Sequence, residues 1–178
     1  MRKLTTDELN RIDIEDFKQA IKHPIVLVLD NIRSLNNVGS AFRTSDAFFI
    51  DKLYLCGITG KPPHRDIQKT ALGATESVTW KHFPNTLDAI QELKQEGYQV
   101  ICVEQIDTSV SLEKFSFSSK EKYALIFGNE AFGVADEVVD ASDIALEIPQ
   151  FGTKHSLNIS VSVGVVLWHY LTTAILKP

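Results

Sequence analysis

The chain has 178 residues, of which 44% are hydrophobic and 23% are charged. This length predicts one domain, and the composition excludes global disorder. Because 18 Lys and Arg stand against 23 Asp and Glu, the net charge of −5 argues against a protein that coats nucleic acid without specificity, yet it allows a local basic patch.

The first 22 residues predict a short helical segment ahead of the domain. Thr5–Glu8 resembles a capping box, and spaced apolar residues follow it up to Phe17. Charged residues begin at position 2 with no apolar stretch behind them, so we expect no secretory signal here. The expected organisation is a helical segment over 1–22 and a single domain over 23–178.

Apolar strands then alternate with helices. The continuous apolar run at 25–29 predicts a strand buried on both faces, which is typical of a parallel sheet. After it we expect, in order, a polar loop, a helix over 38–48, a strand over 53–57, a loop over 58–65, a short helix from Asp66 to Gly73, a strand over 78–80 and a helix that Asn85 opens and Gly97 closes.

The remaining chain continues this pattern. We expect strands over 98–103, 123–127 and 144–148, a short helix over 135–141, a loop over 149–155 and a last long helix from about residue 157. The fold class is therefore α/β, with a mostly parallel sheet and helices on both faces. The stretch 159–176 is long enough to span a bilayer, but its Ser, Gly and Thr residues favour a buried helix. We expect no membrane contact and a cytoplasmic protein.

The cysteines point to the same compartment. Cys56 and Cys102 lie far apart in separate apolar runs, which predicts buried free thiols. No Cys or His spacing matches a zinc site, so no metal is expected.

Three polar loops follow predicted strands, where open α/β sheets bind their ligands. In the first, residues 30–43, Asn36 or Asn37 could cap the helix, Gly39 would let another backbone approach, and Arg43 could grip a phosphate. An ordinary Asn cap with a surface arginine accounts for the same spacing.

The second loop, 128–133, places Glu130 between two glycines, where it could pair with a cation such as Arg43 or stabilise a helix N-terminus. In the third loop, 148–158, Ser156 is the predicted helix cap. The free backbone amides there could hold an anion or an adenine edge, or the loop could be only a capped helix start.

Taken together and in this order, the loops closely resemble the motifs of the SpoU (TrmH-like) branch of the SPOUT RNA methyltransferases. Residues 37–43 look like motif one, with its N-x-G-x-x-x-R core, and residues 125–133 look like motif two. Ile148-Pro149 with residues 156–161 looks like motif three. The resemblance runs from about residue 24 to residue 170 and includes the linking segment 69–74.

This resemblance implies a deep C-terminal trefoil knot that holds S-adenosylmethionine, without a metal. It implies a homodimer with its active site at the subunit interface, to which the last helix contributes, and methyl transfer to a ribose 2′-hydroxyl of tRNA or rRNA. The donor pocket would be formed by Val103, Glu104, Phe127, Gly128, Asn129, Gly133, Ile148, Pro149, Ser156 and Leu157.

The resemblance also assigns roles to the motif residues. Arg43 would be catalytic, but because a guanidinium holds its proton we expect it to bind a phosphate and orient the ribose, not to act as the base. Asn37 and Asn158 would hold the loop and the ribose, and Ser156 would shape the pocket. Glu130 would orient Arg43, an interaction that could cross the subunit interface.

Because the chain is acidic overall, it must grip RNA through local cations. The candidates, each of which could equally be a solvated surface charge, are Arg33, Arg43, Lys61, His64, Arg65, Lys69 and Lys154. The short N-terminal segment makes the chain similar to small family members that modify a tRNA anticodon loop as a dimer.

Three other interpretations remain open at this point. The fold could methylate a base nitrogen in place of ribose, or it could bind RNA without catalysis. The third is a nucleotide-dependent oxidoreductase of Rossmann type, against which the missing G-x-G-x-x-G loop speaks.

Overall fold

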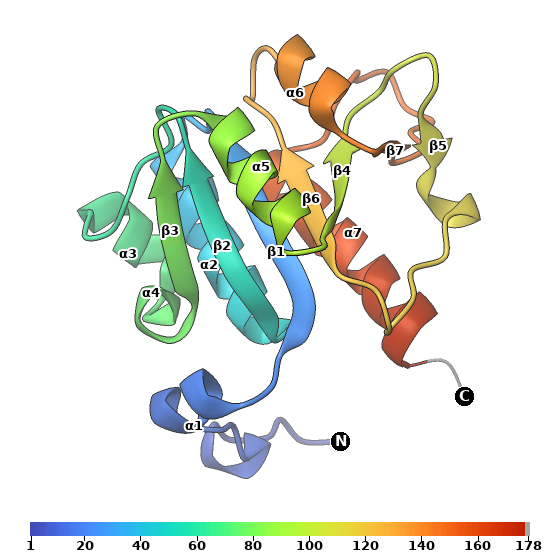
Figure 1. The fold of residues 1–178 in the computed structure, drawn as a ribbon. Helices are drawn as coiled ribbons and strands as arrows, with labels where there is room; N and C mark the ends of the chain where they lie inside the picture. Colours follow the sequence, from blue (N-terminus) through green and yellow to red (C-terminus); the bar gives the residue numbers. More distant parts are fainter. Residues whose placement is uncertain (177–178) are drawn as a thin grey trace.

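The structure, a computed structural model, describes residues 1–176 and is built on a sheet of seven strands that are all parallel (Figure 1). The strands lie in the order β3-β2-β1-β6-β4-β7-β5. Their bounds are β1 (His23–Asp30), β2 (Ile50–Cys56), β3 (Thr79–Phe83), β4 (Gln99–Val103), β5 (Val110–Ser111), β6 (Tyr123–Phe127) and β7 (Ile144–Glu147). The predicted α/β class and parallel sheet are confirmed.

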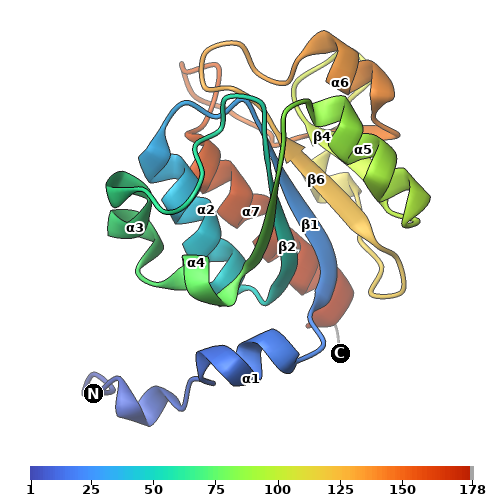
Figure 2. The same ribbon diagram turned by 60° about the vertical axis from the view of Figure 1, so that its left-hand side comes forward.

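Helices cover both faces of this sheet (Figures 1 and 2). One face carries α2 (Leu35–Ala47), α3 (Arg65–Ala71), α4 (Ala74–Ser77) and α7 (Ile159–Tyr170), which continues as a π-helical turn over Leu171–Ile175. The other face carries α5 (Thr86–Gln95) and α6 (Asp136–Ala141).

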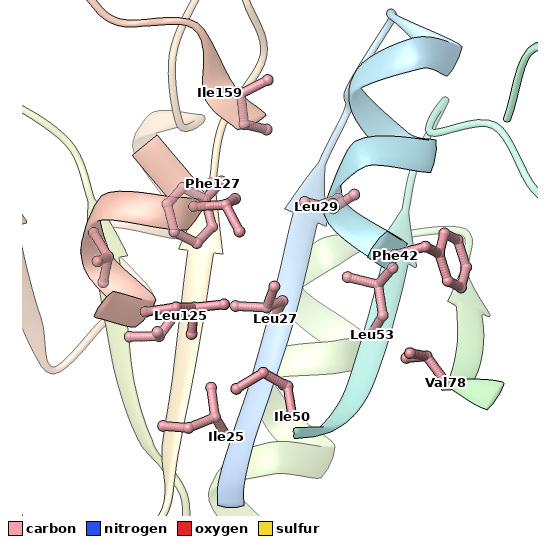
Figure 3. Close-up of a cluster of buried hydrophobic side chains, with 14 of the residues drawn as sticks. Ile25, Leu27, Leu29, Phe42, Ile50, Leu53, Val78, Leu125, Phe127 and Ile159 are labelled. Atoms are coloured by element: carbon pink, nitrogen blue, oxygen red, sulfur yellow. The ribbon is translucent and has the colours of Figure 1, made fainter. Parts of the chain in front are cut away.

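The strand β1 shows why both faces need a cover. Ile25, Leu27 and Leu29 pack into the core beneath α2 and α7, whereas Val26 and Val28 pack into the core beneath α5. Successive side chains of a strand point to opposite faces, so a run without polar interruptions needs apolar partners on each side. Figure 3 shows the first core, which extends to Ile159 at the start of α7.

The N-terminal segment differs from the prediction. The Glu8 carboxylate accepts a hydrogen bond from the Thr5 amide (2.7 Å), as in a capping box, but no side chain caps the turn that follows, and it is only a 3-10 turn, Asp7–Leu9. The helix α1 (Ile14–Gln19) begins instead after Asp13, whose side chain accepts a hydrogen bond from the Asp16 amide (2.8 Å). Of its residues only Phe17 is buried.

Three helix starts were also assigned to the wrong capping residue. Ser34, not Asn36 or Asn37, caps α2, and His64, not Asp66, caps α3. Asn158, not Ser156, caps α7. In each case a second side chain that can accept a hydrogen bond lies within two residues of the predicted one, so the type of residue alone did not decide between them.

The short strand β5 and the 3-10 turn Leu112–Lys114 were not predicted, because two residues are too few to show a strand pattern. Within residues 1–176, no helix is both long enough and apolar enough to cross a bilayer. The stretch tested as a span is α7 and its π-helical turn, which buries Val163, Val166, Leu167 and Tyr170 against the sheet.

Candidate active site

A cavity of about 740 Å³ opens beyond the carboxyl ends of β4, β6 and β7. This is the position that ligands take in open α/β sheets, and the volume suits a small molecule. Nine of the ten residues predicted to bind the methyl donor line the cavity: Val103, Glu104, Phe127, Gly128, Asn129, Gly133, Ile148, Ser156 and Leu157. Pro149 is not in the lining.

The loop 128–133 after β6 forms a tight backbone turn at the cavity wall. Asn129 and Gly133 exchange two backbone hydrogen bonds of 2.9 and 2.8 Å. The Asn129 Oδ1 accepts from the amides of Ala131 (2.9 Å) and Phe132 (3.2 Å). A Cβ at Gly128 would lie 2.2 Å from the Gly133 carbonyl carbon, so the turn closes only with glycine at this position.

Glu130 attaches this turn to the start of α2. Its carboxylate accepts hydrogen bonds from the backbone amides of Arg33 and Ser34, both 3.0 Å. It also accepts one from the Asn37 side chain (2.9 Å). A carboxylate at a helix N-terminus is further favoured by the helix dipole.

Asn37 continues the connection to the third loop. Its Oδ1 accepts a hydrogen bond from the Nδ2 of Asn158 (3.2 Å), the residue that caps α7. Glu130, Asn37 and Asn158, one from each predicted motif, therefore form a single hydrogen-bonded chain although up to 121 sequence positions separate them.

These contacts also set the ionisation of Glu130. Its partial burial alone would raise the pKa of the carboxyl group. Hydrogen bonds from the Arg33 amide, the Asn37 side chain and the Ser34 amide outweigh the burial and hold the pKa of Glu130 below its ordinary value. The Glu130 carboxyl group is therefore ionised at neutral pH.

Gly39 lies where α2 meets α3. A Cβ there would lie 2.3 Å from the Ile67 carbonyl oxygen and 2.1 Å from the Thr70 hydroxyl oxygen. That hydroxyl donates to the Asn36 carbonyl (3.0 Å), which fixes α3 against the first turn of α2. The close approach predicted from the sequence is thus present, and the partner is α3.

Arg43 lies on the exposed surface of α2. Within residues 1–176 it forms no salt bridge, and Glu130 is bound by the amides described above, not by the guanidinium. Within residues 1–176 the Glu130–Arg43 contact is therefore not made inside one chain, where Glu130 is bound by the start of α2.

The third loop lies along the opposite wall of the cavity. Asn158 Oδ1 accepts from the Ser160 amide (2.9 Å) and hydroxyl (2.6 Å), which begins α7. Ser156 is exposed and lines the cavity without capping the helix. The residue missed by sequence reasoning is Gln105, whose Nε2 donates to the His155 carbonyl (3.3 Å). Its position in the loop that follows the strand at 98–103 was the signal that could have identified it.

The lining is acidic. It contains five carboxylates, from Glu104, Glu130, Asp136, Asp140 and Glu147, and in the described part of the chain it contains neither Lys nor Arg. Such a wall favours a cationic ligand over an anionic one.

The predicted RNA-binding cations lie outside the cavity. Arg65 and Lys69 are one turn apart on α3, Lys61 precedes that helix, and Arg33 precedes α2. Lys154 lies in the third loop. All of these side chains are exposed. Lys61, Arg65 and Lys69 belong to the segment of α3, Arg33 to the start of α2 and Lys154 to the third loop.

The SpoU rRNA Methylase family matches this chain over residues 24–168. A similar curated protein is the tRNA (guanosine(18)-2′-O)-methyltransferase of Borreliella burgdorferi, 28% identical over 171 residues, which are 96% of this chain and 76% of that protein. Another is the 23S rRNA (guanosine-2′-O-)-methyltransferase RlmB of Neisseria meningitidis, 29% identical over 94% of this chain and 66% of the relative.

Solved structures share the fold. The AdoMet-bound rRNA methyltransferase of Sinorhizobium meliloti superimposes with a TM-score of 0.80 and 25% identity, over 88% of this chain and 59% of the other. The Aquifex aeolicus TrmH/SpoU tRNA modifying enzyme has a TM-score of 0.76 and 26% identity, over 88% and 77%. The chain thus spans about three fifths of the first of these structures.

Proposed function

We propose that this chain, which belongs to the SpoU rRNA methylase family of RNA 2′-O-methyltransferases, uses S-adenosylmethionine to methylate a ribose 2′-hydroxyl of tRNA or rRNA. The observation that carries the proposal is the hydrogen-bonded chain from Glu130 through Asn37 to Asn158 beside the cavity. Polar side chains hold three separated segments together there. Loops that only connected strands and helices would not need such a network.

The cavity fits the proposed methyl donor. S-Adenosylmethionine supplies a methyl group already activated by a cationic sulfur, and the acidic lining is suited to that charge. Gly128 and Gly133 let a ligand lie against the backbone of the turn. The AdoMet-bound structures among the fold relatives support the same assignment.

The path of the chain is consistent with the proposed trefoil knot. From β6 the chain passes to β7, beyond β4, and then returns to α7, which packs against α2 at the centre of the sheet. Residues 148–158 make this return along the cavity. We propose that this segment is threaded, which is the arrangement implied by the family.

The residues around the cavity would act by positioning. Arg43 would bind the phosphate next to the target nucleotide and so orient the ribose, which brings the 2′-oxygen in line with the methyl group. Glu130 and Asn37 would fix the start of the helix that carries Arg43. A phosphate oxygen or a water molecule would take the hydroxyl proton, because a guanidinium keeps its own.

The outer face of α7 supports a homodimer. Val161, Val165 and Trp168 form an exposed apolar stripe, with exposed fractions of 50%, 37% and 55%. Gly164, beside this stripe, has no neighbour within 4 Å of an added Cβ, so a second helix could approach there. We propose that a second copy covers this stripe and brings its Arg43 to the cavity.

We propose the same for the remaining predictions of domain organisation and RNA binding. Residues 23–178 would form one domain behind the helical segment 1–22, and exposed cations on the α2 and α3 side would grip RNA. Cys56 and Cys102 are buried and unpaired in the described structure, which suits a reducing cytoplasm.

The test is to incubate the purified protein with S-adenosylmethionine carrying a labelled methyl group and with total RNA. We expect label in tRNA or rRNA at a nucleotide that resists alkaline cleavage, because a 2′-O-methyl group blocks the attacking hydroxyl. Label at a cleavable nucleotide would indicate methylation of a base nitrogen. RNA binding without label would indicate a non-catalytic module.

A further inference from the structure

Two carboxylates hold the chain where it leaves the turn after β6. Glu104, directly after β4, accepts a hydrogen bond at Oε2 from the Val134 amide (3.0 Å). Asp30, at the end of β1, accepts one at Oδ2 from the Ala135 amide (3.3 Å). Since β6 lies between β1 and β4, the segment Val134–Ala135 is bound by residues at the ends of both neighbouring strands.

Glu104 is also packed against this turn. Its Oε2 would lie 2.3 Å from a Cβ at Gly133, which has a φ of +72°. Its Oε1 accepts a hydrogen bond from the Gln105 amide (2.8 Å), so both carboxylate oxygens already have a backbone donor. Both carboxylate oxygens of Glu104 are therefore hydrogen-bonded to backbone amides of this chain.

Gln105 is hydrogen-bonded to the third loop, on the opposite wall of the cavity. Its side chain donates to the His155 carbonyl (3.3 Å) in the third loop. Glu104 and Gln105 are consecutive, both line the cavity, and each is bonded to a different one of the two loops that face each other across it.

We propose that Glu104 and Gln105 are positioning residues that set the spacing between the two walls of the donor cavity, and that Glu104 does not bind the donor through its charge. The inference rests on the proposed function, because it concerns the site assigned to the methyl donor. It assigns to Glu104 a role different from the direct contact expected from the resemblance.

The test measures the affinity of the full chain for S-adenosylmethionine and for S-adenosylhomocysteine by calorimetry. The two compounds differ in the charge on sulfur, so they separate positioning from charge attraction. For Glu104→Ala we expect both affinities to fall together, by about tenfold to a hundredfold, as for the loss of a charge-assisted hydrogen bond. Glu104→Gln keeps an oxygen that can accept from Val134 and should recover much of the loss for both compounds.

Variants of Gln105 test the proposal independently of Glu104. Gln105→Ala should weaken both compounds by a few-fold, since a neutral hydrogen bond of 3.3 Å is lost. Gln105→Glu removes the donor and places negative charge against the His155 carbonyl, so it should bind S-adenosylhomocysteine, whose sulfur is neutral, less tightly than Gln105→Ala does. The matched control is Glu121→Ala, which should leave both affinities unchanged. Glu121 is an exposed carboxylate just before the amino end of β6, whereas the cavity lies beyond the carboxyl ends of the strands.

The outcomes are distinct. Wild-type affinity for both compounds in Glu104→Ala and Gln105→Ala would overturn the inference. A loss confined to the cationic compound in Glu104→Gln would also overturn it, because it would show a direct charge contact. If Glu104→Ala does not fold, Glu104→Gln and Gln105→Ala decide. A wild-type protein that binds neither compound would contradict the proposed function itself.

Discussion

Glu130 accepts three hydrogen bonds from the segment around the start of α2 and so joins two motifs through one side chain. These donors select the charged form of the carboxyl group, and this is why its pKa lies below the ordinary value despite partial burial. A pKa that is lower in the folded than in the unfolded chain adds stability at pH values above the unfolded pKa. This stability is lost as the pH falls through the folded value.

Glu130→Gln tests this link. A neutral amide offers one acceptor oxygen to three donors, so we expect the free energy of unfolding to drop by about 1 kcal/mol, a modest figure because most of the side chain is in contact with solvent. The difference between wild type and variant should be constant above about pH 5 and should close below about pH 4. Urea unfolding at a series of pH values measures it, and a difference that does not change with pH would contradict the assignment.

Arg43 presents the opposite case, a charged side chain on α2 that its own chain leaves unpaired within residues 1–176. Arg43→Lys keeps the charge and removes the planar fork that can bind a phosphate through two bonds. We expect methyl transfer to slow by roughly two orders of magnitude or more with unchanged affinity for S-adenosylhomocysteine. Single-turnover kinetics and calorimetry separate the two quantities, and near-normal turnover would remove Arg43 from the proposed mechanism.

At the scale of elements, the central strands were predictable because β1 and β6 contain continuous apolar runs, and Tyr123–Phe127 was placed with its observed bounds. The strand β5, with only two residues, shows no such run. The caps were less predictable. Ser34 and Asn158 compete with neighbours of equal capping ability, and contacts from distant segments, such as Glu130 on the Ser34 amide, select among them. Such contacts are not visible in a local pattern.

The site shows the same division. The motifs indicated which segments converge, and the cavity lies between them. Within one chain Glu130 is bound by two backbone amides and by Asn37, so its predicted interaction with Arg43 stays a prediction for the subunit interface. Gln105 was missed because its only signal is its position after a strand, and its contact with the His155 carbonyl joins residues 50 positions apart.

The contact between α2 and α3 is an element-level prediction. Gly39→Ala inserts a methyl group 2.3 Å from the Ile67 carbonyl oxygen, so the two helices must separate. We expect the free energy of unfolding to fall by about 1–2 kcal/mol, although alanine favours a helix over glycine. Gly152→Ala is the control, because an added Cβ there has no neighbour within 4 Å. Denaturant unfolding compares them, and equal stability of both variants would contradict the packing argument.

At the scale of the whole molecule, the apolar stripe of Val161, Val165 and Trp168 and the unpaired Arg43 point to the same missing element, a second copy of the chain. Trp168 also touches Phe48 at the end of α2, with ring centroids 6.5 Å apart, so the stripe extends toward that helix. For Trp168→Glu we expect a monomer in light scattering that binds S-adenosylhomocysteine and has lost methyl transfer. An active monomer would contradict the proposed shared site.

A shared site has a sharper consequence when two inactive variants are mixed. Arg43→Lys removes the guanidinium. Gly128→Ala distorts the cavity, because the added Cβ collides with the Gly133 carbonyl carbon. If each site combines the cavity of one copy with the Arg43 of the other, a mixed dimer regains one intact site. Random exchange should then restore about a quarter of wild-type methyl transfer. If both residues served the same chain, every site in the mixture would keep a lesion and no activity would return. Mixing after dissociation and reassociation of the two variants, with each variant treated alone as the control, therefore decides whether Arg43 acts across the interface.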